Sequence, residues 1–178
     1  MIESVLWTHQ TTPFLDDDED MQDPQMISKE IKWLKNQPPR LFAASLEGRL
    51  LEYSIETMML VQETESNGGA IWSMAVNPQQ TQLAIGCEDG FIRLFNIANG
   101  ALDYLKSLEK HDGRILSLDW DSNRNWIVAG SGSSSIRKYD IDTGRCIGRM
   151  TVDTIKGEET IVWDLKMLTY VFCSETHL

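Results

Sequence analysis

The sequence repeats itself, and this constrains the fold more than any other feature. Three short apolar runs separated by turn residues occupy residues 71–100, and the same pattern returns 44 residues later. That spacing carries Ile71 onto Ile115, Gly86 onto Gly130, Ile92 onto Ile136, Phe95 onto Tyr139, Asn96 onto Asp140 and Gly100 onto Gly144. Upstream, a spacing of 42 residues carries Gly90 onto Gly48, Phe95 onto Tyr53 and Ile97 onto Ile55. Landmarks held at one spacing without a gap indicate structural repeats.

A period of about 40–45 residues with four short strands per unit is typical of β-propeller blades. The run Phe91–Ile97 is almost wholly apolar, which indicates a strand covered on both faces, as between two neighbouring sheets. Propellers close with about 4–8 blades. We therefore expect an all-β fold, an incomplete β-propeller of about three blades plus the start of a fourth.

The repeat pattern divides the chain. We expect a first strand at residues 1–7, an acidic insert at 8–37, the rest of the first blade at 38–64, the second blade at 65–110, the third at 111–155 and a truncated start of a fourth at 156–178. The acidic half of the insert predicts disorder, and Ser28 is a candidate N-cap for a short helix. An alternative reading places the first strand at Ile31–Leu34 and leaves the residues before it as a tail. The outer strand of the first blade is expected at Met58–Glu63.

Charge and composition exclude several functions. The formal net charge of −11 and the pI of about 4.6 disfavour direct binding to a phosphate backbone. The three cysteines are scattered, which favours a reducing intracellular compartment over a disulfide framework. No basic, apolar leader and no apolar run of membrane-spanning length stands in the sequence. We expect a cytosolic or nuclear protein without a membrane partner.

The sequence contains no complete motif for metal binding or catalysis. Asp16, Asp18 and Asp20 imitate the start of a calcium loop, but Met21 and Ile27 replace the required Gly and Glu. No His or Cys pair has zinc spacing, and no phosphate loop or nucleophile elbow is present. The sequence predicts no metal, no cofactor, no small-molecule substrate and no enzymatic activity. His111 is interpreted as a residue between blades that makes a local hydrogen bond.

The repeats resemble WD repeats, although the terminal Trp-Asp pair is replaced by Tyr53-Ser54, Phe95-Asn96 and Tyr139-Asp140. The resemblance implies an aspartate in the tight turn before the third strand of each blade. Only the second blade keeps it, as Asp89, whereas the third blade has Ser133 there.

A narrower resemblance rests on Gly68–Ala75, Ile85–Gly90, Arg114–Leu118 and Ile161–Trp163. These runs are similar to consecutive blades of the cirhin family, WD-repeat scaffolds of the small-subunit processome. The resemblance implies a non-catalytic scaffold in the nucleus and nucleolus that supports pre-rRNA transcription and small-subunit rRNA maturation. Other processome proteins would be its partners, and pre-rRNA would be reached indirectly. The alternative is a generic WD-repeat adaptor, either a substrate receptor of a ubiquitin ligase or a signalling scaffold.

Partner contacts are expected in the loops at the blade ends, because loops carry recognition while strands carry packing. The candidate contact residues are Trp72, Asn77, Glu88, Asp89, Asp121 and Arg124. Outer blades without neighbours would expose apolar faces and strand edges. We therefore expect poor solubility of this chain alone.

Overall fold

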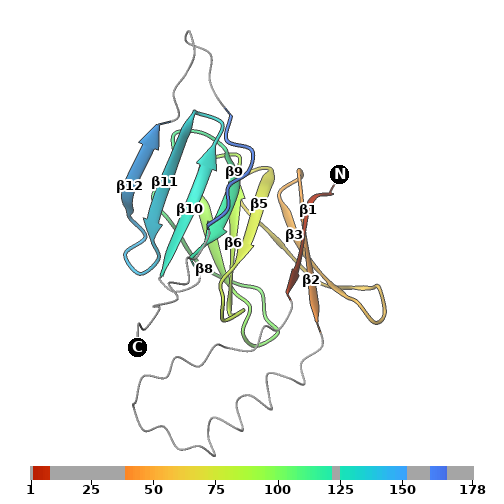
Figure 1. Ribbon diagram of the computed structural model, residues 1–178. Helices are drawn as coiled ribbons and strands as arrows, with labels where there is room; N and C mark the ends of the chain where they lie inside the picture. Colours follow the sequence, from red (N-terminus) through yellow and green to blue (C-terminus); the bar gives the residue numbers. More distant parts are fainter. Residues whose placement is uncertain (1, 9–38, 122–124, 152–160, 168–178) are drawn as a thin grey trace, which may run out of the picture.

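The computed structural model describes residues 2–8, 39–121, 125–151 and 161–167, and all regular structure in these ranges is β-strand (Figure 1). The strands form three four-stranded antiparallel sheets, each a meander in chain order. No helix within the described ranges is long and apolar enough to cross a membrane. The all-β prediction is confirmed.

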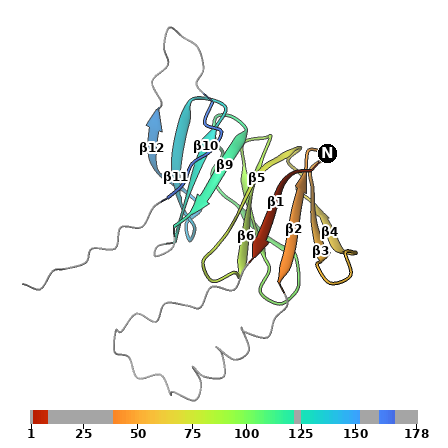
Figure 2. The same cartoon turned by 45° about the vertical axis from the view of Figure 1, so that its right-hand side comes forward.

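Each sheet is one blade. The first holds β1 (Ile2–Thr8), β2 (Arg40–Ser45), β3 (Arg49–Ser54) and β4 (Leu60–Glu65). The second holds β5 (Ile71–Val76), β6 (Gln82–Cys87), β7 (Ile92–Asn96) and β8 (Asp103–Ser107). The third holds β9 (Ile115–Trp120), β10 (Trp126–Ser131), β11 (Ser135–Asp140) and β12 (Cys146–Thr151). Figures 1 and 2 show the second sheet standing between the other two.

The first blade differs in detail from the sequence expectation. β1 pairs antiparallel with β2, with Trp7 opposite Leu41. The alternative strand Ile31–Leu34 and the acidic insert lie outside the described residues. The outer strand begins at Leu60 instead of Met58, because the Met58 N–H donates to the Ser54 carbonyl at 2.8 Å and closes the preceding turn.

The tight turn between the second and third strands needs a left-handed residue in every blade. Gly48 and Gly90 supply it with φ of 84° each, a conformation open to glycine at little cost. The third blade places Ser134 there, with φ of 56°. This serine is buried, so the surrounding structure holds it in the left-handed region.

Two hydrophobic clusters join the blades, and each draws on two neighbouring sheets. The cluster between the first and second blades contains Phe42, Ala44, Leu50, Ile71, Leu83, Ile85, Cys87, Phe95 and Ile97. The cluster between the second and third contains Ala75, Ala84, Ile92, Leu94, Leu108, Ile115, Leu118, Trp120, Ile127, Ala129, Tyr139 and Ile141. Strand β7 therefore contributes to both, which explains its nearly continuous apolar sequence. Removal of this apolar surface from water is the main force that stacks the blades.

Inner strands approach closely where a glycine leaves room. A β-carbon at Gly86 would lie 2.5 Å from Ile115 Cγ2, and the Ser73 hydroxyl donates to the Ile115 carbonyl at 3.2 Å. The next joint repeats this arrangement: Gly130 faces Val162, and the Ser117 hydroxyl donates to the Val162 carbonyl at 3.2 Å. Residues 161–167 thus lie against the third blade, although none of them is assigned to a strand, and the truncated fourth blade expected at 156–178 stays a prediction.

Outer strands also reach across the joints. The Gln62 amide of β4 donates to the Gly100 carbonyl of the second blade at 3.0 Å. The Lys106 ammonium of β8 donates to the Ile141 and Asp142 carbonyls of the third. Gln62 and Lys106 occupy equivalent positions, so a polar contact is repeated at the rim of two successive joints.

Candidate protein-interaction face

Three side chains from two blades meet where the second and third blades join. The Trp72 indole N–H donates to the Glu88 carboxylate at 2.5 Å, and the Arg114 guanidinium lies 5.5 Å from the Trp72 ring centroid. Glu88 and Arg114 approach to 3.9 Å, and both side chains are about half exposed. Trp72 comes from β5, Glu88 from the β6–β7 turn and Arg114 from the connection before β9. We name these three residues the Trp72 cluster.

A second aromatic ring with cations lies on the same turn. The Phe91 ring centroid is 5.6 Å from the Arg93 guanidinium and 5.6 Å from the Lys110 ammonium. The Arg93 guanidinium donates two hydrogen bonds to the Asp89 carboxylate, at 2.6 and 3.0 Å. Burial pushes the pKa of the Asp89 carboxyl upward, but the bonds from Arg93 and from the Phe91 N–H outweigh it and lower that pKa. The carboxylate therefore stays charged and holds Arg93 beside the ring.

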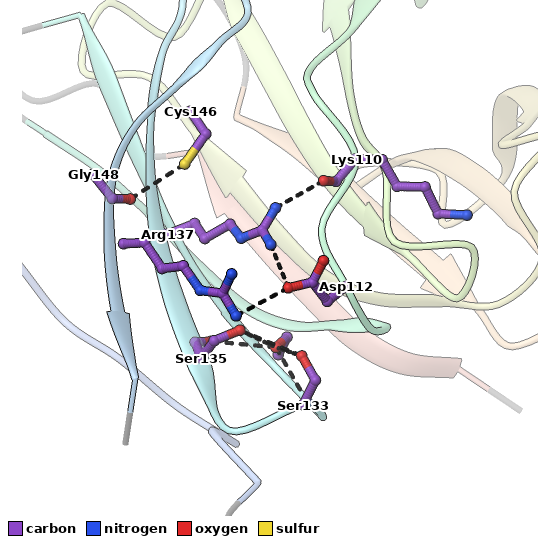
Figure 3. A network of polar contacts seen from close by, with 9 residues as sticks. Lys110, Asp112, Ser133, Ser135, Arg137, Cys146 and Gly148 are labelled. Atoms are coloured by element: carbon purple, nitrogen blue, oxygen red, sulfur yellow. Dashed lines mark hydrogen bonds and ion pairs between the residues drawn. The ribbon is translucent and has the colours of Figure 1, made fainter. Parts of the chain in front are cut away.

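The connection between the blades is fixed by Arg137 of β11 (Figure 3). Its guanidinium donates to the Lys110 carbonyl at 2.9 Å and to the Asp112 carboxylate. Asp112 also pairs with Arg149 of β12 at 3.2 Å. The Arg137 side chain is only 9% exposed, and charge-assisted hydrogen bonds are the strong kind. These contacts hold the segment that presents Lys110 and Arg114.

Figure 3 also shows the hydroxyl triangle that closes the β10–β11 turn. The hydroxyl oxygens of Ser131 and Ser133 lie 2.8 Å apart, and the hydroxyl oxygen of Ser135 lies 3.3 Å from each of them. The Ser133 N–H donates to the Ser131 hydroxyl at 3.2 Å. Neutral hydroxyls thus organise this turn, where Asp89 organises the corresponding turn of the second blade.

His111 lies buried inside the same connection. Its main-chain N–H donates to the Gly90 carbonyl at 2.8 Å, but neither ring nitrogen has a hydrogen-bond partner among the described residues. The local hydrogen bond expected of this residue is therefore made by the backbone instead of the ring. Burial, then the charge of Arg137, lowers the pKa of the imidazole to about 4. The ring is neutral at physiological pH.

The predicted contact residues separate into two groups. Trp72, Glu88 and Asp89 come together on this face. Asn77 lies beyond the other end of β5, is only 7% exposed, and accepts the N–H groups of Thr81 and Gln82 at 2.8 Å each.

Of the remaining two predicted residues, only Asp121 is described by the structure, and it lies apart from the Trp72 cluster. Asp121 follows β9, and its N–H donates to the Trp126 carbonyl at 3.0 Å. Arg124 lies outside the described residues.

Sequence reasoning missed Phe91, Arg93, Lys110 and Arg114. The spacing of Asp89 and Arg93 around a tight turn was a usable signal, since it allows an ion pair. The stacking of Arg114 on Trp72 was not visible, because the two residues belong to different blades.

Trp72, Phe91, Arg93 and Arg114 are of the residue types that protein interfaces favour. Aromatic residues and arginine are enriched in such interfaces and dominate their binding energy. Nothing in the cluster provides an activated nucleophile or an acid–base pair poised near neutrality. Within the described residues, no three His, Cys, Asp or Glu side chains gather as metal ligands.

Comparison with known proteins identifies the repeats. The family profile "WD domain, G-beta repeat" matches residues 59–96 and 102–140. The chain is 34% identical over 141 residues to U3 small nucleolar RNA-associated protein 4 homolog of Homo sapiens, which covers 77% of this chain and 20% of that protein. It is 30% identical over 133 residues to U3 small nucleolar RNA-associated protein 4 of Saccharomyces cerevisiae, with 71% and 17% covered.

Solved structures give the same fold. "Structure of U3-55K" matches with a TM-score of 0.58 and 14% identity, over 63% of this chain and 36% of that one. The crystal structure of the RRP9 WD40 repeats matches with a TM-score of 0.57 and 14% identity, over 63% and 35%. This chain spans about 20% of the length of the human relative. Taken with the three stacked meanders, the matches show that the chain is built of WD-repeat propeller blades.

Proposed function

We propose that this chain is a non-catalytic WD-repeat scaffold segment in ribosome biogenesis. The observation that carries the proposal is the similarity to U3 small nucleolar RNA-associated protein 4, at 34% identity over 77% of the chain. That protein is named for its association with the U3 RNA. We place this chain in the N-terminal propeller of a protein of the same kind, acting in the nucleolus within the small-subunit processome.

The Trp72 cluster and the Phe91 ring are the proposed contact surface for other processome proteins. Their side chains are held in place before binding by Glu88, Asp89 and the Arg137 network. A surface ordered in advance loses little conformational entropy when a partner docks. The net charge of −11 opposes direct contact with a phosphate backbone. Pre-rRNA is therefore reached through the partner proteins.

The test is affinity purification of the tagged full chain from nucleolar extract. The wild-type chain is compared with a Trp72→Ala/Arg114→Ala double variant and with Met150→Ala, a control on the exposed side chain of β12. Processome proteins and U3 RNA are quantified in each eluate. We expect about tenfold less recovery with the double variant and unchanged recovery with the control. Equal recovery by all three, or none by the wild type, rejects the proposal.

The generic adaptor is the rival function, and it shares the same fold and face. Fluorescence imaging of the tagged chain separates the two. Nucleolar foci support the scaffold in ribosome biogenesis, and a diffuse nuclear or cytoplasmic signal supports the adaptor.

A further inference from the structure

The first blade exposes four consecutive apolar side chains at its outer rim. Met58, Met59, Leu60 and Val61 are 71%, 67%, 47% and 58% exposed. They occupy the end of the β3–β4 turn and the start of β4. We name them the rim run. Single exposed apolar side chains are normal, but a contiguous group of them marks a contact surface.

Met58 stands where the other blades have glycine. In the first blade the Met58 N–H donates to the Ser54 carbonyl and the Ser54 N–H to the Met59 carbonyl. In the third blade Gly144 and Asp140 make the same two bonds, the second to the Arg145 carbonyl. The left-handed residue has φ of 55° at Met58, 73° at Gly144 and 71° at Gly100 of the second blade.

Met58 is one of four non-glycine residues with positive φ in the described structure, and the other three are Asn67, Gln80 and Ser134. A side chain in the left-handed region is strained, and glycine relieves the strain. Met58 recovers nothing by burial, since it is 71% exposed. Backbone outliers of this kind gather at binding sites, where the strain is retained for function.

The charge around the rim run differs from that of the other outer strands. Glu56, Glu63 and Glu65 border it, and residues 54–65 contain no Lys or Arg. Arg49 of β3 pairs with Glu63 at 3.2 Å, which leaves an excess of carboxylates at this rim. The outer strand of the third blade and its turn carry Arg145 and Arg149 instead. The rim of the first blade is therefore apolar and acidic, which complements a segment that is apolar and basic.

The backbone edge of β4 is open as well. β4 is the last strand in its sheet, and no other described strand pairs with its outer side. Such an edge presents main-chain donors and acceptors that a peptide can join as an added strand.

We propose that the rim run and the open edge of β4 form a docking site for an extended segment of a partner protein. In that segment apolar residues alternate with Lys or Arg. The apolar side chains pack on Met58, Met59 and Val61, where flexible methionines adapt to their shape. The basic side chains pair with Glu56 and Glu65, and compete with Arg49 for Glu63. This site is separate from the Trp72 cluster and does not depend on it.

The test uses a synthetic peptide of about six residues that alternates valine or leucine with lysine, titrated calorimetrically into the full chain. A matched peptide carries glutamate in place of lysine. The protein variants are Met58→Gly, Val61→Glu and the control Met150→Glu on β12. Met58→Gly keeps the turn that the sister blades form with glycine, so it removes the side chain without harming the fold.

We expect the lysine peptide to bind the wild-type chain and the Met150→Glu control equally. Binding falls at least about tenfold with Met58→Gly and Val61→Glu, and with the glutamate peptide. Amide hydrogen exchange of β4 slows in the complex. The proposal is overturned by failure of the lysine peptide to bind, by equal binding of both peptides or of all variants, or by unchanged exchange in β4.

Discussion

The second and third blades secure equivalent arginines in different ways. Arg93 of the second blade takes its carboxylate from Asp89 in the turn of the same blade, at 2.6 Å. In the third blade the corresponding turn residue is Ser133, which has no carboxylate. Arg137 pairs instead with Asp112, which belongs to the connection between the blades. Both arginines also donate to a carbonyl of the connection before their blade, Arg93 to Asn67 and Arg137 to Lys110. Both blades therefore keep an ion pair at this arginine, although the carboxylate comes from the turn in one blade and from the connection between blades in the other.

This difference has a mechanical consequence. The second blade contains its own anchor, whereas the third depends on the connection that also buries His111 and presents Arg114. Substitutions in the connection between the second and third blades should therefore lower the stability of the protein even when they leave the interior of both sheets unchanged.

Gly86→Val should break the joint. The new side chain collides with Ser73 of its own blade and, at 2.5 Å, with Ile115 of the third blade, and overpacking of this kind costs about 3 kcal/mol. Urea unfolding of the full chain measures the loss. Gly148→Ala is the control, because its β-carbon would lie 3.6 Å from Lys138 in ordinary contact. A loss below about 0.5 kcal/mol for Gly86→Val would contradict the described joint.

Acid should weaken the connection through His111. The folded imidazole has a pKa of about 4, against 6.5 for the ordinary value. Below pH 6.5 the His111 imidazole is protonated in the unfolded state but stays neutral in the folded state. The stability from His111 is therefore complete above pH 6.5 and is lost as the pH falls toward 4, at up to about 1.4 kcal/mol per pH unit.

The measurement is the free energy of unfolding at several pH values between 7 and 4, for the wild type and His111→Phe. The variant removes the titrating ring, so its curve should be flatter over this interval. Parallel curves would show that His111 does not titrate with unfolding.

Asp112→Ala should cost about 1 kcal/mol, because Arg137 loses its carboxylate but keeps the Lys110 carbonyl. The modest size reflects an Asp112 side chain that is 50% exposed. Adding Ser133→Asp gives the third blade the turn carboxylate of the second, and it should restore part of the loss. Thermal denaturation compares the single and double variants. No restoration would mean that the two blades are not equivalent at this position.

Met58→Gly should have the smallest effect, a gain of up to about 1 kcal/mol. The same position of the third blade supplies the counterpart, since Gly144→Ala puts a side chain at φ of 73° and should lose a similar amount. Chemical denaturation of both variants and of the wild type measures the two changes in the free energy of unfolding. A loss of stability with Met58→Gly would remove the argument that the methionine is strained.

Much of the fold could be predicted from periodicity. The repeat spacing predicted the blades, and the continuous apolar sequence of Phe91–Ile97 predicted a strand covered on both faces. The start of β4 was misplaced by two residues, because an apolar Met58 gives no sign that it replaces a turn glycine. Ser134 in the left-handed region was equally invisible, since its conformation is imposed by the surrounding fold.

The candidate site was predictable only within one blade. Trp72, Glu88 and Asp89 were expected at blade ends and lie together on one face. Arg114 and Lys110 join them from the next connection, and only the stacking of blades brings them near. Asn77 was predicted as a partner contact in the β5–β6 turn, but its side-chain oxygen accepts the N–H groups of Thr81 and Gln82 and holds that turn instead. The poor solubility expected of the chain alone stays a prediction, which gel filtration would check.

The most direct test of blade stacking is a double-mutant cycle between Gly86→Val and Ile115→Ala, measured by urea unfolding. If Ile115 lies over Gly86, truncation of the isoleucine removes the Cγ2 atom that would stand 2.5 Å from the new β-carbon and relieves part of the collision. Ser73 Oγ and, at 2.8 Å, the β-carbon of residue 115 still crowd the valine. We predict that the double variant is more stable than the sum of the single losses implies, by at least about 1 kcal/mol. Additive losses, within about 0.5 kcal/mol, would show that the two residues do not meet and would contradict the stacked-blade account.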